Sequence, residues 1–383
     1  MKKTLTVLLA ACLLIAALSG CGSSGVMNAP AQGGGGGSTD TTASSGGLGS
    51  GNQYKWRMAS CWGQGNSLLE VDQRFAELVG ELSGGNFDIT VYPAGELGAS
   101  NAVLDLVGNG TVECGGDWAG YWSGKNTAFD LLGSCMDNFS VMDYYMWVYE
   151  GGGYEDAYQY MYNQYNIQPL PTSFSCAESG LRSTKPIESL QDLAGMKVRI
   201  SGKMQGIVAE KIGFTPVTID ASELYESLQR GVVDAGEFSG PKADDSLRLQ
   251  EVAKYWLTPG WHQSAGMNCA LVNLDAWNSL SGEDQNLLIS AAKLCAAEML
   301  AAKTWDDAEV AARMVQDEGV VITTLGDEDM ATLRQYVLEA YDQCCAENPD
   351  FAKVYESMCN YRKTMDTYRT VLGDYGFGFT YEQ

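Results

Sequence analysis

The sequence predicts an α/β fold in two lobes, followed by long helices at the C-terminal end. Strand and helix patterns alternate over residues 54–114 and again over 190–235, and an aromatic stretch at 117–165 separates these two runs. Such alternation is typical of sheets covered by helices. The body from residue 54 to residue 383 is long enough for two lobes of ordinary domain size.

The first run begins with a strand at 54–59. Residues 68–82 follow as a helix, because their apolar positions recur three and four apart, with Asn66 and Ser67 offering the N-terminal cap. Residues 87–91 alternate apolar and polar side chains, which predicts a second strand. A helix at 102–107 and a short strand at 111–114 complete this run.

The second run repeats the rhythm. It begins with the apolar residues at 190–193 and predicts a strand at 196–200, a helix at 206–212, a strand at 215–219, a helix at 221–230 and a strand at 232–235. Beyond it, residues 281–318 and 327–372 are charged, with few helix breakers and an alanine-rich stretch in the first segment. We therefore expect long terminal helices that embrace the lobes or a partner chain.

The N-terminus has the pattern of an export signal. Lys2 and Lys3 precede an apolar run at 5–18, which is too short for a permanent membrane span. The run closes on Leu-Ser-Gly-Cys21, which resembles the bacterial lipobox, so residues 1–20 are predicted to be removed and Cys21 to carry lipid. The alternative is an ordinary signal peptide with a chance cysteine.

Residues 21–52 are predicted to form a flexible tether. Gly, Ser, Thr and Ala make up most of residues 22–51, with five consecutive glycines at 33–37. Such a segment cannot bury enough apolar surface to offset its ordering entropy. Anchor, tether and body together predict an extracytoplasmic protein that meets the membrane only through its lipid.

The charge balance and the cysteines narrow the class of partner. The formal net charge of -24 argues against nucleic acid or an anionic membrane surface, so a small anion needs a local cationic group to bind. Eleven cysteines, less Cys12 and Cys21, leave nine in the body, without the spacing of a zinc site. We assign no disulfide, since buried free thiols explain scattered cysteines equally well.

Little in the sequence points to catalysis, and we predict no catalytic residue. His262 is the single histidine, there is no GxSxG elbow, and the segment at 124–126 lacks the glycine and hydroxyl of a phosphate loop. An enzyme built on this chain would have to use carboxylates.

Two segments offer groups for a small ligand. Arg199 lies in the strand-like GMKVRI, where its planar fork could hold a carboxylate; the alternative is a surface ion pair. In DWAGYWSGK at 117–125, Tyr121 offers a hydroxyl and Trp118 or Trp122 an apolar wall. Core packing of both tryptophans is the alternative.

With these segments in view, nearly all of the body resembles the solute-binding proteins of TRAP transporters, the DctP family. RFAELVGELSGGNFDITVYPAGELG, GMKVRI and LQRGVVD carry the resemblance. GDWAGYWSGKNTAF, YEGGG, DAGEFSGPKAD and KYWLTPGWHQ resemble the branch that binds 2-oxo or 2-hydroxy monocarboxylates together with a metal ion.

The resemblance implies a fold of the periplasmic-binding-protein type II kind, with two lobes that close about a hinge and long bracing C-terminal helices. The implied divisions are 53–177 for the first part of lobe 1, 178–263 for the core of lobe 2, and 264–383 for the return to lobe 1 and the terminal helices. It also implies that Arg199 pairs with the ligand carboxylate, and that the Glu237 carboxylate and the Phe238 backbone oxygen bind the metal.

Two departures from the branch concern the metal. Glu178 stands where the branch has Gln, and Gln263 stands where it has Glu. Our hypothesis is that both residues face one Na⁺ or Ca²⁺ ion and conserve the acid count around it; the alternative is that Glu178 is a solvated loop acid. Phe238 replaces a common tryptophan, which alters the apolar wall. Trp261 is also predicted to contact the ligand, and the neighbouring His262 either hydrogen-bonds a ligand oxygen or is structural.

The sequence thus predicts a lipid-anchored receptor that captures a small organic acid and delivers it to TRAP membrane subunits, with no organic cofactor. The alternatives are a receptor for a sugar acid or dicarboxylate and a metal-dependent surface lyase or isomerase using Glu178 and Glu237. The resemblance also suggests a homodimer through the C-terminal helices, and a monomer whose helices pack on themselves predicts the same pattern.

Overall fold

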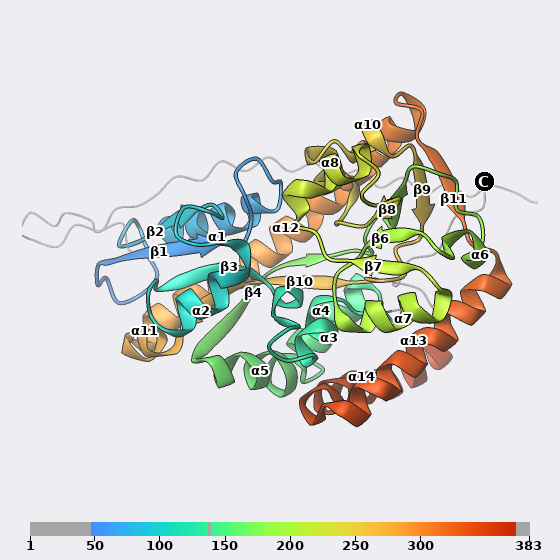
Figure 1. The fold of residues 1–383 in the computed structure, drawn as a ribbon. Coiled ribbons are helices and arrows are strands. Elements are labelled where there is room, and N and C mark those ends of the chain that lie inside the picture. The colour runs from blue at the N-terminus through green and yellow to red at the C-terminus, as the bar shows by residue number, and fades with distance from the viewer. Residues whose placement is uncertain (1–46, 137–138, 373–383) are drawn as a thin grey trace, which may run out of the picture. The chain divides into compact units, whose positions relative to one another are not determined.

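The computed structural model describes residues 47–136 and 139–372, and its strands form two mixed sheets (Figure 1). The predicted signal peptide, Cys21 and most of the tether lie outside the described residues. In the first sheet the order is β2-β1-β3-β10-β4, with β1 parallel to β2 and β3, and β10 antiparallel to β3 and β4. Its strands are β1 (Tyr54–Ser60), β2 (Phe87–Tyr92), β3 (Cys114–Trp118), β4 (Ile167–Ser175) and β10 (Gly266–Asn273).

The second sheet has the order β11-β9-β5-β8-β6-β7. Its strands are β5 (Leu181–Ser183), β6 (Lys197–Arg199), β7 (Thr215–Val217), β8 (Ala235–Gly236), β9 (Tyr255–Thr258) and β11 (Val321–Thr324). The strand β11 follows the long helix α12 (Gly282–Gln316) and pairs with β9. The predicted return of residues 264–383 to lobe 1 therefore needs a correction, because this short strand belongs to the second sheet.

Helices flank both sheets, as the alternating pattern predicts. The helices of the N-terminal part are α1 (Leu69–Leu82), α2 (Val103–Gly108), α3 (Ala128–Gly133), α4 (Val141–Tyr149) and α5 (Tyr160–Tyr162). Those that accompany the second sheet are α6 (Leu190–Leu193), α7 (Lys203–Ile212), α8 (Leu224–Gln229), α9 (Pro241–Ser246) and α10 (Leu249–Val252), and the remainder are α11 (Leu274–Ser279), α13 (Asp327–Glu347) and α14 (Pro349–Leu372).

Three local predictions were wrong. The third strand begins at Cys114 rather than Thr111, because the Asn109 side chain accepts hydrogen bonds from Thr111 and closes a turn there. The strand β8 covers only Ala235–Gly236, since the Gly231 amide bonds back to α8 and holds the preceding residues in a turn. Finally, α1 has no side-chain cap; Asn66 instead accepts from the Leu68 amide just before it.

Two short segments connect the sheets. The chain leaves the first sheet through residues 176–180, between β4 and β5, and returns through 259–265, between β9 and β10. The Glu178 amide donates to the Gln263 carbonyl oxygen at 3.0 Å, so these crossing segments are bonded to each other. Residues at the crossing are thereby held close to both sheets.

The long helices contact elements of both sheets. Helix α12 packs on β4 and α1 of the first sheet and on α9 beside the second (Figure 1). Helix α13 packs on α7, and α14 packs on α3. Ion pairs reinforce one of these contacts, since Lys203 and Lys211 on α7 pair with Glu347 and Glu339 on α13. The C-terminal helices thus brace the body, as expected.

The aromatic stretch between the two runs forms helices whose side chains build the main core. Phe129, Trp147, Tyr158 and Tyr162 are fully buried there. No disulfide joins the cysteines of the described part of the chain. Within 47–136 and 139–372, no helix combines the length and the apolar character that crossing a membrane requires.

Candidate functional site

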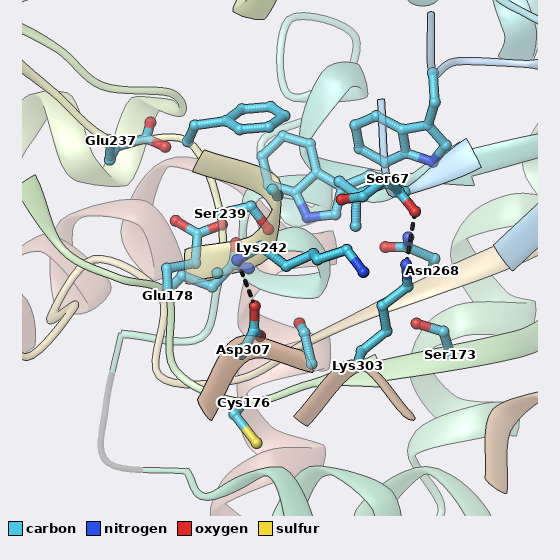
Figure 2. Close-up of a pocket in the computed structure, with 18 of the residues that line it drawn as sticks. Ser67, Ser173, Cys176, Glu178, Glu237, Ser239, Lys242, Asn268, Lys303 and Asp307 are labelled. Atoms are coloured by element: carbon cyan, nitrogen blue, oxygen red, sulfur yellow. Dashed lines mark hydrogen bonds between the residues drawn. The ribbon is translucent and has the colours of Figure 1, made fainter. Parts of the chain in front are cut away.

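A small cavity lies between the two sheets, next to the crossing segments. Its walls combine first-sheet residues such as Trp118 and Asn268 with Arg199 and Glu237 of the second sheet and Lys303 of α12. Its volume is about 70 Å³. A space of this size holds roughly five water molecules, so it suits a ligand of few atoms. Figure 2 shows Glu178 and Glu237 at one end and Ser67, Ser173, Asn268 and Lys303 at the other.

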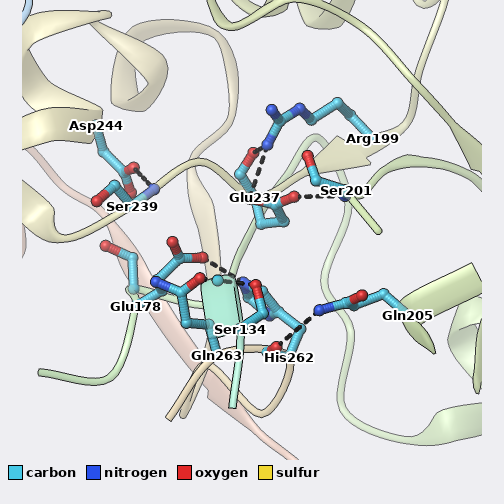
Figure 3. A network of polar contacts seen from close by, with 12 residues as sticks. Ser134, Glu178, Arg199, Ser201, Gln205, Glu237, Ser239, Asp244, His262 and Gln263 are labelled. Carbon is cyan, nitrogen blue, oxygen red and sulfur yellow. Dashed lines mark hydrogen bonds and ion pairs between the residues drawn. The ribbon is translucent and has the colours of Figure 1, made fainter. Parts of the chain in front are cut away.

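Arg199 and Glu237 form a buried ion pair at the first end (Figure 3). Arg199 Nη1 lies 2.7 Å from Glu237 Oε2 and donates to the Glu237 backbone oxygen at 2.6 Å. Arg199 Nε donates to the Ile219 oxygen, and the Ser201 amide donates to Glu237 Oε1. Nη2 has no hydrogen-bond partner among the described residues and is not one of their fully buried unpartnered atoms. Because Arg199 lines the cavity, its guanidinium keeps N–H groups for a further bond.

Glu178 and His262 form a second buried pair beside the first. His262 Nε2 lies 2.7 Å from Glu178 Oε2, and both residues are more than nine-tenths buried. Burial raises the pKa of Glu178 to about 7, partly offset by the bond to His262, and the nearby Glu237 charge raises it further. Burial lowers the pKa of His262, but the bond to Glu178 outweighs this and the net direction is upward. Near neutral pH the pair therefore retains a proton.

Three side chains at this end could hold a metal ion. Glu178, Glu237 and His262 each offer one ligand atom, and these atoms lie within 4.8 Å of one another. Gln263 lines the same cavity, with its Oε1 accepting a hydrogen bond from Ser134 at 2.8 Å. The two positions of the acid-exchange hypothesis, 178 and 263, thus lie in one site, and Glu178 is not a solvated loop acid.

Aromatic side chains form part of the cavity wall. Trp118, Tyr121 and Phe238 line it, as the sequence predicts for an apolar wall. Trp118 donates from Nε1 to the Gly133 oxygen and packs edge-on against Tyr121, with ring centroids 5.3 Å apart. Burial raises the pKa of the Tyr121 hydroxyl, so it stays protonated and can donate.

Two tryptophans predicted for the ligand site lie elsewhere. Trp122 is buried in the core, where its Nε1 donates to Asp117, and it does not line the cavity. Core packing, the alternative for this residue, is what the structure shows. Trp261 lines a separate cavity with Leu333 and Val337 of α13. His262 sits behind Glu178, where it positions the carboxylate and does not itself line the ligand cavity.

Sequence reasoning missed the polar groups at the other end of the cavity. Ser67, Ser173 and Asn268 line it there, together with the α12 residue Lys303. Asn268 did carry a signal, because it is a polar residue inside the otherwise apolar segment GMNCALVN. Such an interruption of an apolar strand often indicates a functional side chain. Lys303 carried no such signal, because lysine is ordinary on a charged helix.

These features define a class: a two-lobed binding protein with a buried arginine and two acids in a small cavity at the interlobe crossing. A family model for bacterial extracellular solute-binding proteins, family 7 (DctP), matches residues 58–348. The chain belongs to this family, whose members are transport receptors that bind small organic acids outside the cytoplasm and work with TRAP membrane subunits.

Similar proteins agree with this assignment. A monocarboxylate 2-oxoacid-binding periplasmic protein of Nostoc sp. is 31% identical over 317 residues, which cover 83% of this chain and 86% of the relative. A solved TRAP solute-binding protein of Pseudoalteromonas atlantica, with sodium and pyruvate bound, is 28% identical with a TM-score of 0.78, covering 86% of this chain and all of that one. One of Bordetella bronchiseptica, with calcium and picolinate, is 27% identical with a TM-score of 0.78, covering 84% and 96%.

Proposed function

We propose that this chain is the receptor of a TRAP transporter for a small 2-oxo or 2-hydroxy monocarboxylate, bound together with a sodium or calcium ion. The observation that carries the proposal is the meeting of Arg199, Glu237 and Glu178 at one end of a small cavity. The similar proteins that bind pyruvate or picolinate with such an ion support the same ligand class. The chain captures the acid unchanged and hands it to the membrane subunits, so its role is not enzymatic.

Arg199 is the group that would hold the ligand carboxylate. A guanidinium binds a carboxylate through two parallel N–H bonds, and in Arg199 Nη1 is used by Glu237 while Nη2 has no hydrogen-bond partner among the described residues. A full two-point grip therefore requires Glu237 to share or release Nη1. Positive charge placed near Glu237 would favour that release, which makes binding of the acid and of the cation mutually supportive.

The residues present fit a hard cation. Sodium and calcium take carboxylate and carbonyl oxygens, and Glu178 and Glu237 bring their carboxylates together here. The Phe238 backbone oxygen accepts no hydrogen bond among the described residues, and Gln263 Oε1 keeps a lone pair beyond its bond to Ser134. When bound, the cation would supply the positive charge that offsets both glutamates and a ligand oxygen.

The walls and the outer parts of the chain complete the proposal. Trp118, Tyr121 and Phe238 would enclose the ligand, with the Tyr121 hydroxyl as a donor.

Cys21 would anchor the mature chain by lipid, which mass spectrometry of the N-terminal peptide would detect as a diacylglycerol adduct. A homodimer through α13 and α14 would appear as a doubled mass in light scattering.

The test is calorimetric titration of the purified chain with pyruvate, 2-oxobutyrate and lactate, first after chelation and then with sodium or calcium restored. We expect stoichiometric binding that depends on the cation and returns the acid unchanged. Failure of every acid with every cation, in protein shown to be folded, would contradict the ligand class. Turnover of the acid would favour a lyase or isomerase instead.

A further inference from the structure

The far end of the cavity is built from neutral polar side chains. Ser67 and Ser173 are each 6% exposed and Asn268 is 9% exposed. Figure 2 shows all three at the end opposite Glu178 and Glu237. A ligand head held at Arg199 would therefore direct its tail toward them.

These three side chains have no hydrogen-bond partners among the described residues. No bond of the Ser67 or Ser173 hydroxyl or of the Asn268 amide group occurs there, although the Ser67 backbone oxygen accepts from Lys303. They are not sealed off either, since none is among the buried atoms without a partner. Because buried polar groups in proteins are nearly always hydrogen-bonded, three open ones around one cavity indicate that its occupant supplies their partners.

Strand register in the first sheet brings the Ser173 and Asn268 side chains together. Asn268 on β10 is the direct register partner of Ser173 on β4 and of Trp118 on β3. Cross-strand partners project to the same face of a sheet, so the three side chains line the cavity side by side. A register shift between Asn268 and Cys269 locally re-aims the strand at this point.

The cations near this end are already neutralised. Lys303 pairs with Glu70 and donates to the Ser67 oxygen at 2.7 Å, and Lys242 pairs with Asp306 at 2.7 Å. The Asp307 carboxylate lines the cavity as well. A second carboxylate on the ligand would find no unpaired cation here, whereas a hydroxyl could both donate to and accept from the serines and the amide.

We propose that the natural ligand is a short 2-oxo or 2-hydroxy acid whose tail carries a neutral hydroxyl group, and that Asn268 and Ser173 determine this specificity. The inference rests on the proposed function, because it assumes that the carboxylate end lies at Arg199. It adds a tail subsite that selects against purely aliphatic acids and against dicarboxylates of similar length.

The experiment compares three probes that share the head group. Affinities of the purified chain for 2-oxobutyrate, 4-hydroxy-2-oxobutyrate and 2-oxoglutarate are measured by calorimetry with the cation present. We expect the hydroxylated acid to bind at least about tenfold more tightly than either other acid, because a site built to hydrogen-bond a hydroxyl rejects the analogue without it. In Ser173→Ala and Asn268→Leu this preference should fall below about threefold, mainly because the hydroxylated acid binds more weakly.

The outcomes separate this inference from the proposed function. Ser290→Ala, which removes an exposed α12 hydroxyl, is the matched control and should retain the full preference. If 2-oxobutyrate binds as tightly as its hydroxylated analogue, or if the preference survives in Ser173→Ala, the tail subsite is refuted and the receptor role stands. If no 2-oxo acid binds with any cation, the proposed function itself fails. Ser173→Ala is the smaller change and keeps the test decisive if Asn268→Leu does not fold.

Discussion

Two buried arginine–carboxylate pairs in this protein have opposite surroundings. Arg182 Nε donates to Asp244 at 2.9 Å with its guanidinium 3.8 Å from the Trp256 ring, and the arginine is fully buried. Arg199 and Glu237 are nearly as buried, yet both line the cavity, whereas Arg182 and Asp244 do not. Burial and pairing alone therefore do not identify a ligand-binding arginine; a place in a cavity wall does.

Of the two arginines, Arg199 should have the larger effect on ligand affinity. We expect Arg199→Ala to weaken binding of the acid at least a thousandfold, about 4 kcal/mol, because it removes the charged partner of the buried ligand carboxylate. Calorimetry in the presence of the cation measures this loss. Retention of affinity within tenfold in folded protein would mean that another group holds the carboxylate.

Arg182→Ala should produce the complementary result. Breaking a buried pair from one side costs about 3–5 kcal/mol, since Asp244 would stay buried without its cation. Denaturant unfolding measures the stability, and the affinity of the remaining folded protein should change less than threefold. A large loss of affinity without a loss of stability would assign Arg182 to the ligand site and erase the distinction between the pairs.

A buried acid without an arginine sharpens the comparison further. Asp72 is fully buried, accepts from Ser60, and has its pKa raised to about 7, mainly by burial. The folded state therefore holds a proton that the unfolded chain releases near pH 4, so the unfolding free energy should fall as pH rises from about 4 to 7.

Asp72→Asn should remove part of this pH dependence and raise the unfolding free energy at pH 8 by about 2 kcal/mol, since no charge then has to be buried. Urea unfolding at pH 5 and pH 8 provides the measurement. Asp117, with a pKa also raised to about 7, should preserve the remaining slope. A variant that is less stable than the wild type at pH 8 would contradict the account.

The smallest effect is expected at an exposed pair near Arg182. Lys185 lies 3.4 Å from Asp234 and its side chain is two-thirds exposed. Lys185→Ala should change stability by about 0.5 kcal/mol or less and leave affinity unchanged, because solvent screens such a pair. If Lys185→Ala lowered the unfolding free energy by more than about 2 kcal/mol, an exposed pair would matter as much as a buried one. Burial would then not explain the loss of stability expected in Arg182→Ala.

Much of the fold could be predicted from the sequence, because periodic apolar residues fix most helices and strands directly. The start points of β3 and β8 could not be predicted, because they depend on hydrogen-bonded turns at Asn109 and Gly231. Alternation alone also did not reveal that β11 crosses back to the second sheet.

At the site, Arg199 was a candidate from its own strand, whereas Glu237 and Glu178 were identified through resemblance to a family, and the contacts of all three depend on the fold. The pairing of Glu178 with His262 joins residues 84 positions apart, which no local pattern encodes. The sequence offers no way to choose between Trp118 and Trp122 as the wall residue. In the structure a short 3-10 turn at 119–122 places Trp118 at the cavity and Trp122 in the core. Asn268 and Ser173 become partners only through strand register.

The crossing segments have a consequence for how this receptor can evolve. The Glu178 carboxylate lines the cavity and also bonds to His262 on the other crossing segment. A substitution at Glu178 therefore changes the chemistry of the ligand site and removes a side-chain link between the two crossing segments. Ligand selectivity and the stiffness of the hinge should for this reason change together, and compensating substitutions should arise in pairs, one on each crossing segment.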